Sequence, residues 1–306
     1  MPVAALRNSW KFWVDVVKAT VRLWLDAQVF VHAAALAFFT VFSIAPVVIV
    51  AVTIVGLVLG ESAAQGQIAE RLQAVIGPEA AAAVQTAVEG SRIERSGILP
   101  SLAGFGALLF GATTVFAQMQ NALNAIWGVA PQPTRSSVML YVKGRLLSLT
   151  VVLAIGFVLL VSLLLSVAVQ ALVVFARDWV PVPPYLLVVL DWTVSLFVVT
   201  LLFGTIFRVL PDVMLRWHDV RVGAFVTALL FAFGRLLIAR YLSTTATAST
   251  YGAAGSLVLL LMWVNYSSLI LLLGAAFTRA HLEARGRPVR PRITAVRVHR
   301  ELMQDS

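Results

Sequence analysis

The feature that most constrains the fold is a series of long apolar segments, one of which lies in a stretch from Ser96 to Thr134 without a charged residue. A helix needs about 20 apolar residues to cross the hydrocarbon core of a bilayer. Hydrophobic residues make up 60% of the chain and charged residues 12%, whereas a soluble domain carries about 25% charge. A soluble protein of this size could not hide so much apolar surface. We therefore expect a membrane protein, and the composition excludes a soluble enzyme, a disordered chain and a fibrous repeat.

Six segments are long enough to cross the membrane, which predicts an all-α, polytopic bundle of six transmembrane helices. We expect an interfacial helix over residues 1–30, the six-helix domain over 31–281, an external helical loop over 61–97, and a basic, flexible cytoplasmic tail over 282–306. The predicted spans cover about residues 33–59, 98–121, 146–176, 185–207, 222–242 and 253–278.

Lysine and arginine residues are divided unevenly between the two predicted sides of the membrane. Five arginines fall on one side, at positions 71, 92, 95, 177 and 240, and most of the others fall on the side that holds both chain ends. Cytoplasmic loops are enriched in these residues, so we expect both termini in the cytoplasm. The basic residues of that side are Arg7, Lys11, Lys18, Arg22, Arg135, Lys143, Arg145, Arg208, Arg216, Arg221, Arg279, Arg285, Arg287, Arg290, Arg292, Arg297 and Arg300.

The N-terminal segment has the pattern of an amphipathic helix. Charged residues from Lys11 to Asp26 recur every three or four positions, and Trp10, Val17 and Trp24 recur on another face. This pattern fits a helix in the cytoplasmic interface with tryptophans at headgroup level. It fits equally well a helix packed against the base of the bundle.

The external loop over residues 61–97 is predicted to form a helical hairpin. Ile68, Leu72 and Ile76 share one face of a first helix, and Gly77-Pro78-Glu79 then begins a second one with Pro in its first turn. Such a hairpin would cover the outer mouth of the bundle or serve as a structural cap.

The net charge of +9 lies mostly beside the apolar segments, so we expect anionic lipid headgroups at the cytoplasmic face, and no nucleic acid, as partners. The candidate headgroup ligands in the tail are Arg285, Arg287, Arg290 and Arg292. No cysteine is present and the four histidines do not cluster by spacing, so we expect no disulfide, metal site or cofactor. The sequence is compatible with a homo-oligomer.

Ionisable residues within spans are costly and usually face a partner or a wet cavity. Asp191 and Arg235 both fall roughly 10 Å below the predicted external surface, at 1.5 Å per residue. Their helices follow one another and are expected to be neighbours. We therefore predict an intramembrane ion pair, which serves either as a structural clamp or as the lining of an externally open polar cavity.

Other polar residues and one proline stand out within the predicted spans. Asn265 falls mid-span and must find a partner, either on a neighbouring helix or, less favourably, on a substrate. Pro46 should kink the first span. Gln118, Asn121 and Asn124, with Gln120, end the second span as interface residues or a gate.

Four stretches carry further motifs. They are residues 33–40 (AAALAFFT) with Ser43 and Pro46, residues 122–128 (ALNAIWG), Leu210-Pro211-Asp212 with Trp217 and Gly223-Ala224, and residues 251–256 (YGAAGS) followed by Trp263 and residues 274–278 (GAAFT). Over about residues 30–282 the chain resembles the YihY/BrkB family of bacterial inner-membrane proteins, once called ribonuclease BN-like.

The resemblance implies six spans, a multi-pass position in the bacterial inner membrane, links to serum resistance and virulence, and proposals of lipid or lipopolysaccharide-precursor transport. It implies no secure biochemical activity. The family commonly has a glutamate at the position of Ala276, and its absence here argues against a proton- or cation-coupled role for that position.

Three functions follow from these observations. The first is a transporter or flippase-like handler of a lipid or another amphiphile in envelope biogenesis. The second is a non-transporting membrane scaffold for envelope assembly. The third and least favoured is a ribonuclease, because no soluble-enzyme signature is present and only Asp212, His218 and Asp219 offer local candidate groups for phosphodiester cleavage. We expect no enzyme activity.

Overall fold

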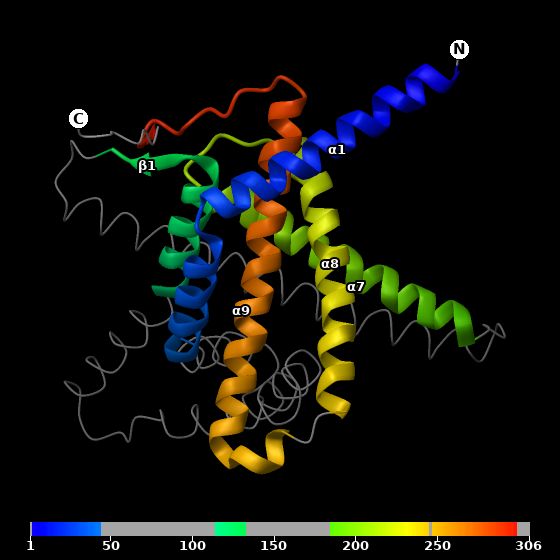
Figure 1. The fold of residues 1–306 in the computed structure, drawn as a ribbon, viewed down its shortest axis with the longest axis vertical. Helices are drawn as coiled ribbons and strands as arrows, with labels where there is room; N and C mark the ends of the chain where they lie inside the picture. The colour runs from blue at the N-terminus through cyan, green and yellow to red at the C-terminus, as the bar shows by residue number, and fades with distance from the viewer. Residues whose placement is uncertain (1, 44–113, 133–183, 245–246, 299–306) are drawn as a thin grey trace, which may run out of the picture.

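The computed structural model describes residues 2–43, 114–132, 184–244 and 247–298, and nearly all of this part is helical (Figure 1). The predicted all-α class is therefore confirmed for the described residues. The elements in chain order are α1 (Pro2–Asp26), a helix over Val29–Ser43, a helix over residues 114–127, β1 (Val129–Pro131), α7 (Pro184–Val209), α8 (Trp217–Thr244), α9 (Thr247–Ala284) and β2 (Ala295–Arg297).

Three described helices are long and apolar enough to cross a membrane, with the qualifying segments Trp192–Val209, Trp217–Leu237 and Leu260–Ala284. A bent pair, Trp10–Asp26 and Val29–Ser43, would add a fourth if it forms one span. The three helices coincide with the last three spans predicted from the sequence. The count of six stays a prediction, because the third span, the external loop and parts of the first two spans lie outside the described residues.

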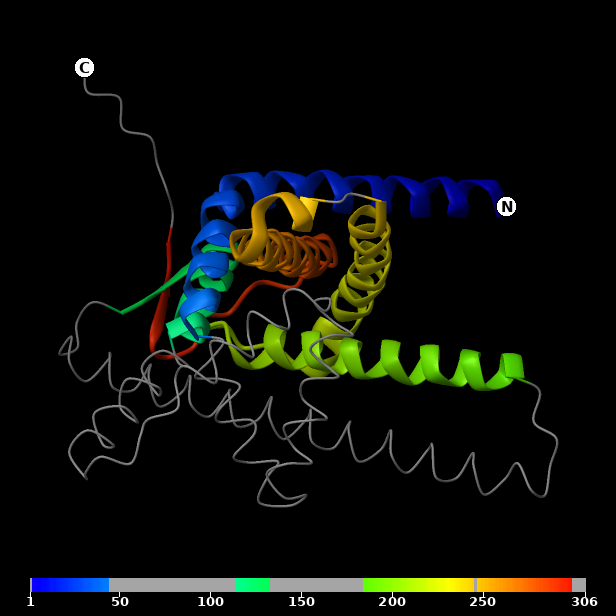
Figure 2. The same cartoon turned by 90° about the horizontal axis from the view of Figure 1, so that it is seen from below.

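The helices surround a central pair formed by α8 and α9. Figure 2 shows α1 and α7 on opposite sides of this pair. The helix over residues 114–127 runs beside the helix Val29–Ser43 in both views. The end of α9, the start of α8 and the two short strands all lie at one end of the described bundle (Figure 1). We call this the basic end, because the last turns of α9 and the segment that follows contain a run of arginines from Arg279 to Arg297.

Small residues bring α8 and α9 close together. A Cβ at Gly223 would lie 1.8 Å from Thr278 Oγ1, and a Cβ at Gly274 would lie 1.8 Å from Thr227 Oγ1. Each threonine hydroxyl donates to the carbonyl oxygen of the glycine four residues before it, at 2.6 and 2.7 Å. The contact is thus reciprocal, with the same Gly-x-x-x-Thr pattern on both helices. Small residues are used in this way where helices must pack without a hydrophobic driving force between them.

Local signals explain where the helices end at the basic end. Gly128 has φ +64° and Gly286 has φ +68°, a left-handed conformation that glycine adopts without strain. After α9, Gly286 N–H donates to Glu283 O and Arg287 N–H to Leu282 O, which is a Schellman motif. Pro211 follows α7 and cannot continue that helix. The helix over 114–127, α7 and α9 therefore each end within a few residues of a glycine or a proline.

The buried core also lies toward this end. Its largest fully buried side chains include Leu123 and Trp127 from the helix over 114–127, Phe207 from α7, Val220 from α8 and Leu272 from α9. One continuous cluster joins these residues to the helix Val29–Ser43. Many apolar side chains of α7 and α8 are instead exposed, as expected of helices that face lipid.

The segment after α9, described up to residue 298, pairs with other parts of the chain, and the flexibility predicted for residues 282–306 stays a prediction. β2 pairs with β1 in an antiparallel register from Val129–Arg297 to Pro131–Ala295, and Val213 forms a bridge with Pro291. Val289 and Ala295 are buried. Periodicity could not reveal this arrangement, because a short extended segment full of Arg and Pro shows no apolar pattern until it is paired with another part of the chain.

Candidate functional site at the basic end of the bundle

The centre of the basic end is a polar network of Gln120, Asn124 and Asp212. Asn124 Nδ2 donates to Asp212 Oδ2 at 2.8 Å, while the main-chain N–H of Asp212 donates to Asn124 Oδ1 at 2.8 Å. Gln120 Nε2 donates to the same carboxylate oxygen at 3.3 Å. Asn124 is only 3% exposed, so these bonds satisfy an amide that would otherwise be buried without partners. The network fixes the loop after α7 to the end of the helix over 114–127.

Arg292 joins the C-terminal segment to the same loop. Its main-chain N–H donates to Asp212 O at 2.9 Å, and its Nη2 donates to Val209 O at 3.1 Å and to Arg208 O at 3.4 Å. The guanidinium thus occupies carbonyl groups that the end of a helix leaves without partners. A cation at this position also interacts favourably with the dipole of α7. Arg292 is therefore held by the protein.

Arg279 performs the corresponding role for the helix over 114–127. Its Nη1 donates to Ile126 O at 2.6 Å, and its Nε donates to Glu283 Oε1 at 2.7 Å. A Cβ at position 128 would lie 3.2 Å from Arg279 Nη1. Gly128 therefore serves two purposes, since it adopts positive φ and leaves room for the arginine.

A second carboxylate, Asp219, fixes the start of α8. Its Oδ2 accepts from the main-chain N–H of Arg216 at 2.9 Å, and its Oδ1 lies 2.8 Å from Arg287 Nη1 and 2.9 Å from His218 Nε2. Both acidic candidates for a nuclease site, Asp212 and Asp219, are thus engaged by protein groups. Within the described ranges no group of three or more His, Cys, Asp or Glu residues is arranged to hold a metal ion.

Other basic side chains of this end point to solvent. Arg285 and Arg290 are exposed, and neither guanidinium has a hydrogen bond or ion pair with any other described residue. Of the four candidate headgroup ligands, these two remain available, whereas Arg287 and Arg292 have protein partners. Main-chain contacts still position Arg290, because its carbonyl accepts from Met214 N–H at 2.9 Å.

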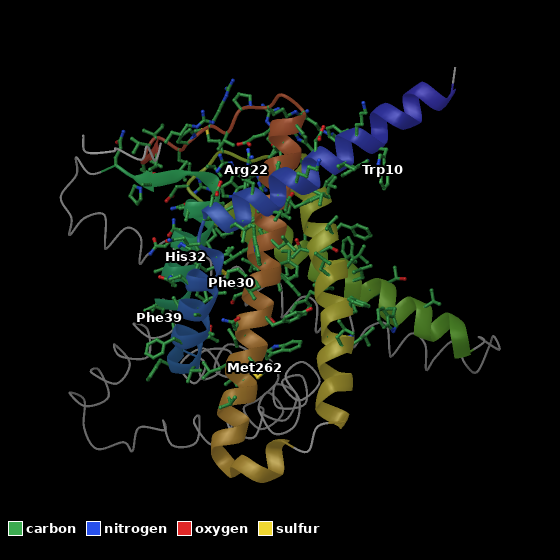
Figure 3. The ribbon with its side chains drawn as sticks, viewed as in Figure 1. Trp10, Arg22, Phe30, His32, Phe39 and Met262 are labelled. Carbon is green, nitrogen blue, oxygen red and sulfur yellow. The ribbon has the colours of Figure 1, made fainter. Side chains whose placement is uncertain are left out.

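The N-terminal helix α1 presents three different faces at this end. One face packs on α9, with Val16 and Thr20 buried and Trp13 stacked on Phe277 and His281. Next to it lies an apolar stripe, and beyond the stripe are the charged residues. Figure 3 shows Trp10 on the part of α1 that projects beyond α9. The stripe consists of Trp10, Val17, Val21 and Leu25, each at least 46% exposed.

The remaining predicted site residues are not brought together in the described part of the chain. Arg235 on α8 and Asn265 on α9 are half-buried, and no hydrogen bond joins them. The side chain of Asp191 and the whole of Pro46 lie outside the described residues, so the ion pair and the kink stay predictions. Gln118 is half-buried and Asn121 exposed, and neither joins the network around Asp212.

Sequence reasoning missed the role of Asp212 and Arg279. The sequence presents Asp212 as part of a family motif and as a candidate nuclease group, and its place after a Pro at a predicted helix end predicts no partner for it. The useful signal was the amide-rich end of another predicted span on the same side of the membrane. For Arg279 the signal was a glycine directly after a helix, which leaves a carbonyl group for a distant donor.

The fold and this network define a helical membrane protein whose helix ends are joined at one side. The chain matches the family described as Virulence factor BrkB over residues 20–296, and it belongs to that family. The family motifs within the described residues account for much of the structure just described: Asn124, Gly128, Asp212, Gly223 and Thr278 all lie in them. The resemblance seen in the sequence is thereby confirmed.

Relatives support the same class. A UPF0761 membrane protein of Psychromonas ingrahamii is 25% identical over 88% of this chain and 90% of its own length. The ribonuclease-like protein YfkH of Bacillus subtilis is 29% identical over 55% of this chain, and a UPF0761 membrane protein of Ralstonia nicotianae is 27% identical over 56%. The chain spans 63% of the Bacillus protein and 37% of the Ralstonia protein. No solved structure matches the chain.

Proposed function

We propose that the chain crosses the bacterial inner membrane six times, with the basic end and both termini in the cytoplasm. The exposed apolar faces of α7 and α8 support lipid contact, and the distribution of Lys and Arg supports this orientation. The described residues that the sequence assigns to cytoplasmic loops also lie together at one end of the described bundle (Figure 1). Labelling of single introduced cysteines from either side of the membrane tests the arrangement.

On this basis we propose that the protein handles an amphiphile with an anionic headgroup in envelope biogenesis, as a transporter or flippase. Two features of the basic end carry the proposal: Arg285 and Arg290 are exposed, and α1, which bears the exposed apolar stripe, packs on the last turns of α9 through Trp13 and His281. Such a surface attracts anionic headgroups at about 1 kcal/mol per basic residue near the membrane. It also provides apolar contact for acyl chains.

Reconstitution in liposomes tests the transport step. Purified full-length protein is inserted into vesicles that contain fluorescent phosphatidylglycerol, and the loss of signal to an impermeant quencher is followed. We expect faster exchange between leaflets than in protein-free vesicles, and slower exchange when Arg285 and Arg290 are both changed to Gln. Arg22→Gln combined with Arg216→Gln, which removes the same charge from two other exposed side chains, is the matched control. Exchange no faster than in empty vesicles would contradict transport.

A specific observation favours a second function, that of a non-transporting scaffold. Hydrogen bonds from Asn124, Arg279 and Arg292 join three helix ends and the C-terminal segment into one unit. A fixed end suits a platform for other proteins better than a moving gate. Crosslinking in intact cells separates the two functions: a stable protein partner together with no lipid exchange supports the scaffold.

Ribonuclease activity is the least favoured function. Asp212 and Asp219 already accept hydrogen bonds from protein groups, which gives both carboxylates a structural role. Cleavage of RNA by the purified protein, abolished by Asp212→Asn in a folded variant, would revive it.

A further inference from the structure

On the outward side of the crossing between α7 and α8, a basic and aromatic cluster lies above two apolar stripes. We call this the α7–α8 outer surface. It comprises Phe197, Leu201 and Arg208 on α7, and Trp217, Arg221 and Phe225 on α8.

The cluster at the top of this surface is ordered by a contact between the two helices. Arg208 Cζ lies 4.7 Å from the centroid of the Trp217 ring, which is a cation–π geometry. The ring itself rests on α7, because a Cβ at Gly204 would lie 3.3 Å from Trp217 Cζ3. Stacking fixes the plane of the guanidinium and leaves its N–H edges free to bind an oxyanion.

Arg221 extends this cluster along α8. Trp217, Arg221 and Phe225 are spaced four residues apart, so they lie on one face of the helix. All three are exposed, Trp217 by 44% and Phe225 by 47%. On α7, Phe197 and Leu201 share a face with Arg208 by the same reasoning, and they are 62% and 38% exposed. The Arg208–Trp217 contact brings the two stripes together at their basic ends.

No carboxylate in the described part of the chain forms an ion pair with the arginines of this cluster. Within the described ranges, neither Arg208 nor Arg221 forms an ion pair. The carboxylates closest in sequence are engaged elsewhere, Asp212 with Asn124 and Gln120, and Asp219 with Arg287 and His218. The half-buried Arg208 and the exposed Arg221 therefore lie on neighbouring helices near Trp217 and have no counter-charge among the described residues.

The apolar stripes have the length of one membrane leaflet. From Phe197 to Arg208 the rise along α7 is about 16 Å, and from Phe225 to the exposed Leu236 the rise along α8 is also about 16 Å. Half of a bilayer core is about 15 Å thick. A phospholipid with its phosphate at the arginines could thus lay one acyl chain on each helix.

We propose that the α7–α8 outer surface is a binding site for an anionic phospholipid, with the phosphate held by Arg208 and Arg221 beside Trp217. The inference rests on the proposed handling of an amphiphile and adds a second lipid-binding surface, on α7 and α8, to the one proposed at Arg285, Arg290 and the α1 stripe. Charge complementarity selects a lipid over a second copy of this chain, whose facing surface would present the same two arginines if the contact were isologous.

Native mass spectrometry of the full-length protein in detergent tests the site. Phosphatidylglycerol is titrated against phosphatidylcholine with the same acyl chains. We expect phosphatidylglycerol to bind at least about tenfold more tightly, and Arg208→Gln combined with Arg221→Gln to remove that preference. The control pair, Arg22→Gln with Arg216→Gln, removes the same charge from two other exposed side chains and should keep the preference. Trp217→Leu should weaken binding a few-fold.

Several results would overturn the proposal. Equal affinity for the two lipids would show that no headgroup is recognised, and an unchanged preference in the Arg208/Arg221 variant would place the lipid elsewhere. Full competition by inorganic phosphate would make the ligand a free anion, and crosslinking between copies through Phe225→Cys would show a second copy on this surface. If the double Gln variant fails to fold, Lys at both positions should keep the headgroup preference and lose the ring stacking; no preference in that variant would contradict the site.

The lipid-exchange assay in vesicles separates this proposal from the proposed transport function. A wild-type protein that retains phosphatidylglycerol here but exchanges no lipid in vesicles contradicts transport and supports the site. A protein that exchanges lipid, and whose Arg208/Arg221 variant binds phosphatidylglycerol unchanged, contradicts the site alone.

Discussion

The basic end and the α7–α8 outer surface contain the same kinds of residues but use them in opposite ways. At the basic end, Arg279 and Arg292 donate to helix carbonyls, and Asp212 accepts from a buried amide. On the outer surface, the half-buried Arg208 and the exposed Arg221 form no ion pair with a described residue and lie at the end of stripes of exposed Phe and Leu side chains. Arginine content alone therefore does not identify a ligand site in this protein, because the partners of each guanidinium decide its role.

The comparison is sharpest at Asp212. Changing it to Ala leaves Asn124, which is 3% exposed, without its main acceptor. We expect a loss of about 3 kcal/mol in the free energy of unfolding, because removing one partner of a buried polar pair leaves the other uncompensated. Unfolding by sodium dodecyl sulfate in mixed micelles measures it. Asn121→Ala, on the same helix but exposed, should change stability by less than about 0.5 kcal/mol. Equal effects of the two changes would remove the distinction between the two regions.

The close approach of α8 and α9 should be almost as sensitive. Gly274→Ala places a methyl group where Thr227 Oγ1 lies 1.8 Å away, so the helices must separate or the threonine must turn. Overpacking of this kind costs about 2 kcal/mol. Gly204→Ala, whose nearest contact would be 3.3 Å, should cost clearly less. The same unfolding assay compares them, and a harmless Gly274→Ala would contradict the packing.

Arg292 should show a smaller effect. Arg292→Gln removes the donor to the last carbonyls of α7 but keeps the main-chain bond to Asp212. A loss of about 1 kcal/mol is expected for such a cap. Arg290→Gln, an exposed neighbour, is the control and should be close to neutral. If both changes leave the free energy of unfolding unchanged, the bonds from the Arg292 side chain to α7 contribute nothing to stability.

Changes on the α7–α8 outer surface should have the smallest effect on stability. Phe225→Leu keeps an apolar side chain that faces lipid, and we expect a change below about 0.5 kcal/mol. Leu123→Ala, in the fully buried core, should cost about 3 kcal/mol. The melting temperatures of both variants in detergent give the comparison, and a large loss for Phe225→Leu would mean that this surface is covered by protein.

The sequence was sufficient where the structure depends on long patterns. Apolar length predicted the three helices α7, α8 and α9, which are long and apolar enough to cross a membrane. The structure at the ends of the helices could not be predicted from such patterns. The C-terminal segment becomes ordered only by pairing with Val129–Pro131, and Asp212 acquires its role only when Asn124, distant in sequence, lies beside it. Neither contact can be predicted from the local propensity of the residues, because each joins segments far apart in the sequence.

The same reasoning explains the mixed outcome for α1. Its period identified an amphipathic helix but left two positions open, against the bundle or in the interface. In the structure Val16 and Thr20 are buried while Trp10 and Val17 stay exposed, so one apolar face packs on the bundle and the contact of the other with the membrane interface stays a prediction. A helical-wheel projection of the sequence separates the two apolar faces of α1, but only its packing on α9 shows which face is buried.

The central claim is that the bundle crosses the membrane with its basic end in the cytoplasm. The most direct test is to measure on which side of the membrane each end of α8 and α9 lies. The chain has no cysteine, so Arg290→Cys and Thr244→Cys each introduce a unique thiol at opposite ends. In spheroplasts treated with an impermeant maleimide, Thr244→Cys should be labelled at once and Arg290→Cys only after lysis. Labelling of both from outside, or of Arg290→Cys alone, would contradict the arrangement.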